Sequence, residues 1–265
     1  MSFTSLAFYL FLPIVFSAYW LICYPRKGKS VSKIRLWLQN LFVVIASYIF
    51  YGWWDWRFLI LITITAIWAW LSGLQLMVLA DQRLRKYVVA TAFVVNLGIL
   101  GFFKYYDFFV ENILYILNNV GLHPHVISLN IILPVGISFY TFQALSYVID
   151  VYRGDIKPTK DLVAFLAFVS FFPQLVAGPI ERATNLLPQF LNVRRFDYLL
   201  AVDGCRQMLW GFFKKLVVAD RCAFAANNIL KIAGGGIFHL CQFLLASYVL
   251  HFRYIVISRD ILILL

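Results

Sequence analysis

The side chains best suited to acid–base chemistry in this sequence are its four histidines, because the pKa of imidazole lies near neutral pH. His123 and His125 flank Pro124, a spacing that can turn two imidazoles toward one metal ion, but no third ligand lies nearby in the sequence. His239 and His251 stand alone in apolar sequence, without an acidic, Ser or Cys neighbour. We therefore expect a solvated loop at His123 and His125, and we expect no metal site.

The serines and cysteines form no nucleophile motif. The run GISFY places Ser138 after a glycine, but Tyr140 stands where the nucleophile elbow of a hydrolase has its second glycine, which argues against a serine hydrolase. The cysteines are widely spaced and include no C-x-x-C pair, which favours packing over zinc or disulfide chemistry. They are Cys23, Cys205, Cys222 and Cys241.

Polar side chains recur inside one long apolar segment, Ile127–Gly154. Pro134 and Gly136 interrupt this segment, and polar residues follow the interruption. At bilayer depth such groups face other protein groups or a water-filled cavity. We expect four of them to line a passage: Ser138, Thr141, Gln143 and Ser146.

Charged residues stand at the ends of two apolar segments. Asp150 and Arg153 lie three residues apart, so we expect them to pair across one helical turn. Glu181 and Arg182 directly follow the helix-breaking sequence AGPI. Charge in that position either marks a functional passage or anchors the chain at the membrane surface.

Two lysines end the run GFFKK. Lys214 and Lys215 can extend to the lipid headgroups, or they can bind the phosphate groups of an acyl donor. The headgroup role is the commoner one for lysine beside aromatic residues. Both interpretations place this run at a membrane surface.

The elements that position these residues must be membrane helices. Of the 265 residues, 63% are hydrophobic and 13% charged, and the mean hydropathy is +0.82, which excludes a soluble protein. Several stretches hold the roughly 20 apolar residues that cross a hydrocarbon core about 30 Å thick. Because backbone groups in lipid must be hydrogen-bonded within the protein, we expect an all-α, polytopic integral membrane protein.

The net charge of +11 reflects topology rather than nucleic-acid binding. The 23 Lys and Arg residues form short clusters between apolar runs instead of one basic surface. The segment Tyr24–Arg35 is basic and has no acidic residue, and Asp81–Lys86 is basic as well. The positive-inside rule places both loops in the cytoplasm and the N-terminus outside.

The apolar runs predict four regular spans, followed by less regular segments. The spans are Phe3–Cys23, Ile34–Trp54, Asp55 to about Ala80, and Tyr87 to about Phe103. We expect Lys104–Val120 to form an interfacial helix. Asp161–Ala183 contains Pro173, Gly178 and Pro179, so it forms either a re-entrant hairpin or a span. The segment Tyr198–Leu230 carries too many charges for an ordinary span, so we expect it to lie partly at the cytoplasmic interface.

Six stretches, in this order, resemble the bacterial membrane-bound O-acyltransferase (MBOAT) family. They are SLAFYLFLPIVFSAYW, ASYIFYGWWDWRF, NLGILGFFKYYDFF, LPVGISFYTFQALSYVIDVYRG, FVSFFPQLVAGPIERA and GFFKKLVVAD. The resemblance covers Phe3 to about Asn228 and is strongest to the members that acetylate alginate. LPVGISFYTFQ and FPQLVAGPIER are its most specific parts.

This resemblance implies a function. A cytoplasmic acyl thioester, such as acetyl-CoA, would give its acyl group through the membrane to hydroxyls of an extracytoplasmic polysaccharide such as alginate. It also implies the bacterial inner membrane and an extracytoplasmic acyltransferase partner. The family uses an invariant His and a second His in an RRWH-like segment, and a neutral imidazole can act there as general base. None of the four histidines here matches either motif, so no catalytic residue is assigned.

The last residues depart from the family pattern, which continues there into a motif like FQIYCDFSGYTDIA. Residues His251–Leu265 have the sequence HFRYIVISRDILILL. Codons can be chosen for them such that translation starting at the third base of the His251 codon gives all fourteen residues of that motif. We therefore expect a one- or two-base change in the gene between about Ile232 and Leu250. Residues 1–230 would then be the N-terminal part of an acyltransferase domain, inactive alone, and residues 231–265 an out-of-frame tail. Sequencing the gene tests this, and an intact frame with other codons contradicts it.

Other functions stay open at this point. Within the same chemistry, the family also includes D-alanyl transfer to teichoic acid and O-acetylation of peptidoglycan. From other classes, the chain could be a noncatalytic membrane scaffold, or a transporter whose broken helices form a substrate site. The transporter alternative is weaker, because no matching second half is visible in the sequence.

Overall fold

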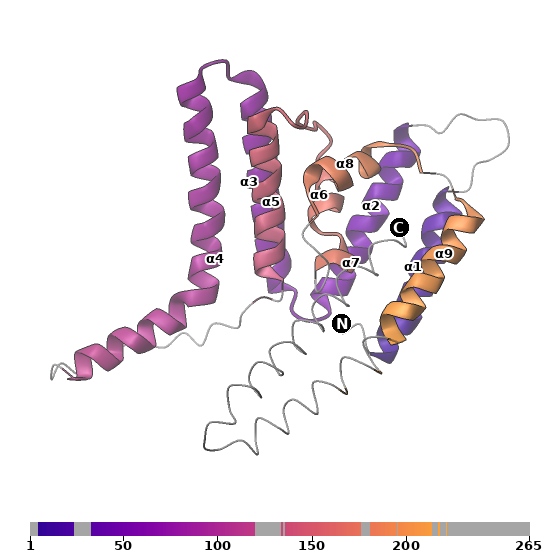
Figure 1. Cartoon of the computed structure of the whole chain (residues 1–265), viewed down its shortest axis with the longest axis horizontal. Coiled ribbons are helices and arrows are strands. Elements are labelled where there is room, and N and C mark those ends of the chain that lie inside the picture. Colours follow the sequence, from indigo (N-terminus) through magenta and orange to yellow (C-terminus); the bar gives the residue numbers. More distant parts are fainter. Residues whose placement is uncertain are drawn as a thin grey trace, which may run out of the picture. The chain divides into compact units, whose positions relative to one another are not determined.

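The computed structural model describes residues 5–23, 33–119, 134, 136–175, 181–194, 196–213, 217 and 221. Every regular element in this described part is helical (Figure 1). The predicted all-α class is therefore confirmed. The out-of-frame tail predicted for residues 231–265 lies outside the described residues.

The chain divides into two compact units. The first, Met1–Leu175 with Ile180–Arg194, contains the eight helices α1 to α8. The second, Val176–Pro179 with Arg195–Leu265, contains α9, Tyr198–Phe213. In the first unit the bounds are α1 Leu6–Cys23, α2 Lys33–Gly52, α3 Arg57–Val78, α4 Gln82–Asn119, α5 Ile137–Arg153, α6 Leu162–Val169, α7 Phe172–Leu175 and α8 Ala183–Leu191.

Three helices of the described chain are long and apolar enough to cross a membrane. They lie in α2, α3 and α4, and they correspond to the predicted second, third and fourth spans. The α1 helix is also apolar but shorter. Length and composition therefore agree with a protein that is embedded in a membrane.

The boundary predicted inside α4 is wrong. The structure has one helix of 38 residues, Gln82–Asn119, where the sequence predicted a span ending near Phe103 and a separate interfacial helix. At about 1.5 Å per residue α4 is about 57 Å long, nearly twice the thickness of a hydrocarbon core. Figure 1 shows its C-terminal part turning away from the direction of its first part. No proline interrupts this stretch, and charged residues such as Lys104 do not by themselves end a helix.

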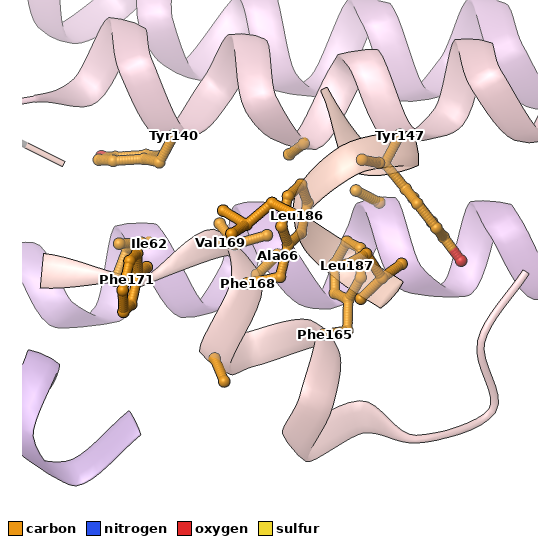
Figure 2. Close-up of a cluster of buried hydrophobic side chains, with 14 of the residues drawn as sticks. Ile62, Ala66, Tyr140, Tyr147, Phe165, Phe168, Val169, Phe171, Leu186 and Leu187 are labelled. Atoms are coloured by element: carbon orange, nitrogen blue, oxygen red, sulfur yellow. The ribbon is translucent and has the colours of Figure 1, made fainter. Parts of the chain in front are cut away.

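The core of the first unit forms where α5 packs against α3 and α4, and where α2 packs against α6. Figure 2 shows Tyr140 and Tyr147 pointing from α5 into this core. The approach of α3 to α5 requires a glycine, because a Cβ at Gly73 would lie 2.7 Å from the Tyr147 ring. Other buried residues of the cluster are Ile62, Ala66, Phe165, Phe168, Val169, Phe171, Leu186 and Leu187.

Candidate functional site

The described residues 161–175 and 181–191 form three short helices, α6, α7 and α8. The first helix, α6, has 8 residues and is therefore about 12 Å long, too short to cross a membrane. The Asp161 carboxylate caps α6 by accepting hydrogen bonds from Val163 N and Ala164 N. After the four-residue helix α7 the chain returns, since α8 packs against α6 and the Phe171 and Phe190 rings lie 5.6 Å apart. The short α6 and the packing of α8 against it favour the re-entrant hairpin over a single span.

Side chains from α2 and α5 hold this re-entrant segment in place. Ser47 Oγ in α2 accepts a hydrogen bond from Phe172 N at 3.2 Å. In α5, Gln143 Nε2 donates to Phe168 O at 2.9 Å and to Gln174 Oε1 at 3.4 Å. Breaks between short helices leave backbone groups without helical partners, and burying them unpaired is costly. The two polar side chains therefore satisfy buried groups that the break exposes.

Gly136 brings the start of α5 against α7. Its φ of +75° is in the left-handed region that favours glycine. A Cβ there would also lie 2.6 Å from Leu175 O and 3.2 Å from the Tyr51 hydroxyl. Both the backbone conformation and the available space therefore exclude a side chain at this position.

Two buried tyrosine hydroxyls near this junction have no hydrogen-bond partner among the described residues. They belong to Tyr51 in α2 and Tyr140 in α5, whose residues are 6% and 0% exposed. Tyr140 lies one turn after Gly136, and helical side chains lean toward the N-terminus of their helix. Both phenols therefore lie near the first turn of α5. We call this place the α7 site, formed by Ser47, Tyr51, Gly136, Tyr140, Gln143, Gln174 and Leu175.

Of the residues predicted to line a passage, the structure brings Gln143 into the α7 site. Ser138 is half-buried, and Thr141 is buried with no partner for its hydroxyl in the described part of the chain. Ser146 Oγ donates to Gln143 O at 2.8 Å within α5. That these residues line a passage stays a prediction.

Several other predicted residues fall on parts of the chain that are not described. The lysines of GFFKK and the four histidines lie outside the described residues: Lys214, Lys215, His123, His125, His239 and His251. Among the described residues, no group of three His, Cys, Asp or Glu side chains could hold a metal ion.

Sequence reasoning did not assign four polar residues to the α7 site: Ser47, Tyr51, Tyr140 and Gln174. A signal was present, since three of the six family-like stretches contain them. ASYIFYGWWDWRF supplies two, and LPVGISFYTFQ and FPQLVAGPIER supply one each. Three of the stretches that carry the resemblance thus meet at one buried place in the fold.

At the other end of α5, the predicted pair of Asp150 and Arg153 does not form. The only ion pair found among described residues joins Arg57 to Asp55. Asp150 is buried, with no partner for Oδ2 among the described residues, whereas Arg153 is exposed and acts on the carboxyl only through its charge. Burial raises the pKa of Asp150 above its usual value, although nearby Arg182 acts in the opposite direction.

The end of α8 is anchored by an arginine that the sequence did not single out. The Arg194 guanidinium donates hydrogen bonds to Gln189 O, to the Tyr19 hydroxyl and to Asn40 Oδ1. It also lies 4.8 Å from the centre of the Phe190 ring. These contacts join α8 to α1 and α2, so they fix the returning arm of the re-entrant segment.

Comparison with known proteins places these features in a family context. No protein-family profile matches the chain. The "Probable alginate O-acetylase AlgI" of Pseudomonas aeruginosa is 39% identical over 234 residues, which are 88% of this chain and 42% of that protein. The peptidoglycan O-acetyltransferase of Helicobacter pylori is 30% identical over 84% of this chain and 45% of its own length. A teichoic acid D-alanyltransferase of Streptococcus thermophilus is 31% identical over 40% of this chain and 26% of its own length.

The similarity covers most of this chain but a smaller part of each relative. Further proteins named as AlgI match at 36 to 38% identity over 88% of the chain. The chain spans less than half the length of these relatives. Over most of its own length, the chain is therefore a homologue of the AlgI alginate O-acetylases, with peptidoglycan O-acetyltransferases and teichoic acid D-alanyltransferases as further relatives.

Proposed function

We propose that this chain is part of a membrane O-acyltransferase that moves an acetyl group to hydroxyls of an extracytoplasmic polysaccharide such as alginate. The donor is a cytoplasmic thioester, and acetyl-CoA is the candidate. The observation that carries this proposal is the identity of 39% to an alginate O-acetylase over 88% of the chain. The meeting of three family-like stretches at the α7 site supports it.

The geometry of α5 to α8 suits transfer through a membrane. A re-entrant segment whose backbone groups are hydrogen-bonded by polar side chains is tolerated at bilayer depth where protein surrounds it or where it lines a cavity. Gln143 lies in the α7 site, and Ser138, Thr141 and Ser146 lie on the same helix. We propose that these residues line the passage for the acyl group.

The proposed setting is the bacterial inner membrane, with the N-terminus outside. The basic segments Tyr24–Arg35 and Asp81–Lys86 support cytoplasmic positions for the α1–α2 and α3–α4 loops. An extracytoplasmic acyltransferase would be the partner that completes delivery to the polymer. For Lys214 and Lys215 we propose two alternative roles: contact with the lipid headgroups, or binding of the phosphate groups of the donor.

The catalytic group of the proposed reaction must come from outside residues 1–230. A chimera tests whether residues 1–230 supply the remaining, noncatalytic part of the protein. In this chimera, residues 1–230 replace the matching region of P. aeruginosa AlgI. Membranes that contain the chimera and its partner proteins should transfer labelled acetyl groups from acetyl-CoA to alginate. The present chain alone, and AlgI lacking the matched region, should transfer none.

Two outcomes separate this proposal from the other classes. A correctly inserted chimera without transfer would favour a noncatalytic scaffold, and transfer by the present chain alone would contradict its proposed inactivity. Uptake of a solute by vesicles containing only this chain would favour a transporter. Replacing alginate with peptidoglycan or teichoic acid as acceptor tests the other acyl transfers that the relatives' names suggest.

A further inference from the structure

The C-terminal part of α4 leaves the bundle that its first part joins. Ala92, Asn96 and Leu100 are buried, but no described residue of α4 after Leu100 is buried. Figure 1 shows this part turning away from α3 and α5. We call residues 104–119 the α4 arm. Its large apolar side chains that are 45 to 70% exposed are Tyr105, Phe108, Phe109, Ile113 and Tyr115.

The α4 arm carries its charges on one side. Lys104, Asp107 and Glu111 follow one another at intervals of three and four residues, so they form one strip along the helix. The opposite side holds an apolar stripe whose members are four residues apart: Tyr105, Phe109 and Ile113. A helix of this kind lies along a membrane surface, with its apolar side among the lipid chains and its charges in water.

The length of the span before the arm places Lys104 at a membrane surface. Residues 87–103 include no charged residue, and as a helix they are about 26 Å long. A hydrocarbon core is about 30 Å thick, so α4 completes its crossing close to Lys104. A straight continuation would carry the apolar stripe into water, whereas burying apolar surface is favourable by about 25 cal/mol per Å².

The turn between α2 and α3 marks the same level. Trp53, Trp54 and Trp56 lie in this turn and are 61 to 66% exposed. Figure 1 shows α3 and α4 side by side, joined by a short turn at their other ends. Counted from that joining turn, the 22 residues of α3 bring Arg57 level with about residue 103 of α4. Because tryptophan concentrates at membrane–water interfaces, the tryptophans and the start of the arm indicate one membrane surface.

The apolar stripe of the arm also continues the exposed side of the span. Tyr87, Val94 and Phe102 are 48 to 71% exposed, and helical spacing puts them on the same side of α4 as Tyr105 and Phe109. The exposed apolar side of a membrane-spanning helix contacts lipid. This continuity favours lipid over a partner protein as the surface that covers the arm.

We propose that the α4 arm is a membrane anchor that lies along the surface opposite the α3–α4 turn, with its apolar stripe among the lipid chains and its charged strip in water. The proposed topology makes this the extracytoplasmic surface. Tyr51 lies two residues before Trp53, so the same surface passes close to the α7 site. The proposal goes beyond acyl transfer and does not depend on it.

Nitroxide labels on single cysteines test the proposal in the purified chain in lipid nanodiscs, with the four native cysteines replaced by serine. Oxygen concentrates in lipid, whereas a nickel chelate stays in water. Labels at Phe109→Cys and Ile113→Cys should collide more often with oxygen. The label at Glu111→Cys, the matched control on the charged strip, should collide more often with nickel. Val94→Cys, in the span, should give the highest ratio of oxygen to nickel collisions.

Two results with these labels would overturn the proposal. If the labels at Phe109 and Ile113 respond to nickel as the label at Glu111 does, the arm lies in water. If they meet neither reagent, a protein surface covers the stripe instead of lipid.

A measurement on the unaltered chain does not depend on any variant folding. A phospholipid with a photoreactive group near its glycerol backbone should couple to residues 105–117 and to residues 53–56 of the chain in nanodiscs. Coupling at residues 53–56 alone, or at neither place, would contradict the anchor. Either of these results would leave the proposed acyl transfer standing.

Discussion

Some buried polar side chains of this bundle hydrogen-bond to backbone groups and others do not, and this difference should affect the free energy of unfolding. Gln143 and Ser47 bond to backbone groups of the re-entrant segment, and Tyr147 accepts from Thr159 N at 3.3 Å. Tyr51 and Tyr140 make no such bonds. The first kind should therefore contribute to the free energy of unfolding, and the second kind should not.

Removal of the phenol hydroxyls tests this difference. Tyr51→Phe and Tyr140→Phe should leave the free energy of unfolding unchanged or raise it by about 1 kcal/mol, because each removes an unpaired buried hydroxyl. Tyr147→Phe should lower it by about 1 kcal/mol. Denaturation of the purified variants in lipid nanodiscs measures all three. An equal loss in all three variants would mean that the structure assigns the hydroxyls wrongly.

Replacing Gln143 tests how the re-entrant segment is held. Gln143→Leu keeps the size of the side chain but leaves Phe168 O without its partner, and should cost about 1–3 kcal/mol. Gln189→Leu is the matched control, because Gln189 is exposed on α8, and it should change stability by less than about 0.5 kcal/mol. Comparable losses of stability in the two variants would argue against a stabilising hydrogen bond between α5 and α6.

The buried carboxylate of Asp150 predicts a dependence on pH. Its pKa is raised in the folded protein, chiefly by burial, so the folded state holds this proton more tightly than the unfolded state does. Its contribution to stability is therefore most favourable below the unfolded pKa, about 4, and declines as the pH rises toward the folded pKa. Asp150→Asn should remove this decline and be the more stable protein at neutral pH. A steeper decline in the variant than in the parent would contradict the assignment.

At the scale of elements, two close approaches fix how α5 sits among its neighbours. Gly136 admits Leu175 O at the start of α5, and Gly73 in α3 admits the ring of Tyr147. The hydrophobic pattern predicts that these segments are helices, but it cannot show which faces meet. Close helix packing therefore depends on single glycines whose role becomes visible only in the structure.

Adding one methyl group tests the contact between α3 and α5. Gly73→Ala places a Cβ 2.7 Å from the Tyr147 ring and should cost about 1–3 kcal/mol by overpacking. Gly98→Ala, in α4, is the control, since nothing lies within 4 Å of its Cβ position. There the higher helix propensity of alanine should raise stability by about 0.5–1 kcal/mol. The sign of the two changes should therefore differ, and the same sign for both would refute the packing described for α3.

At the scale of the whole molecule, the sequence predicts what depends on composition and misses what depends on packing. The spans in α2 and α3 follow from runs of apolar residues, and the break before α5 follows from Pro134 and Gly136. The pairing of Asp150 with Arg153 failed because helical spacing does not say which side chain is buried. The α7 site could not be assembled from the sequence, because Ser47 and Phe172 meet across 125 residues of chain.

The O-acetyl content of alginate tests the central proposal most directly. Cells that lack their own AlgI would receive the chimera in which residues 1–230 replace the matching region of the P. aeruginosa protein. The alginate that these cells secrete should regain O-acetyl groups, while cells that receive AlgI without that region should secrete unacetylated alginate. Unacetylated alginate from cells whose membranes contain the intact chimera would contradict the proposed function.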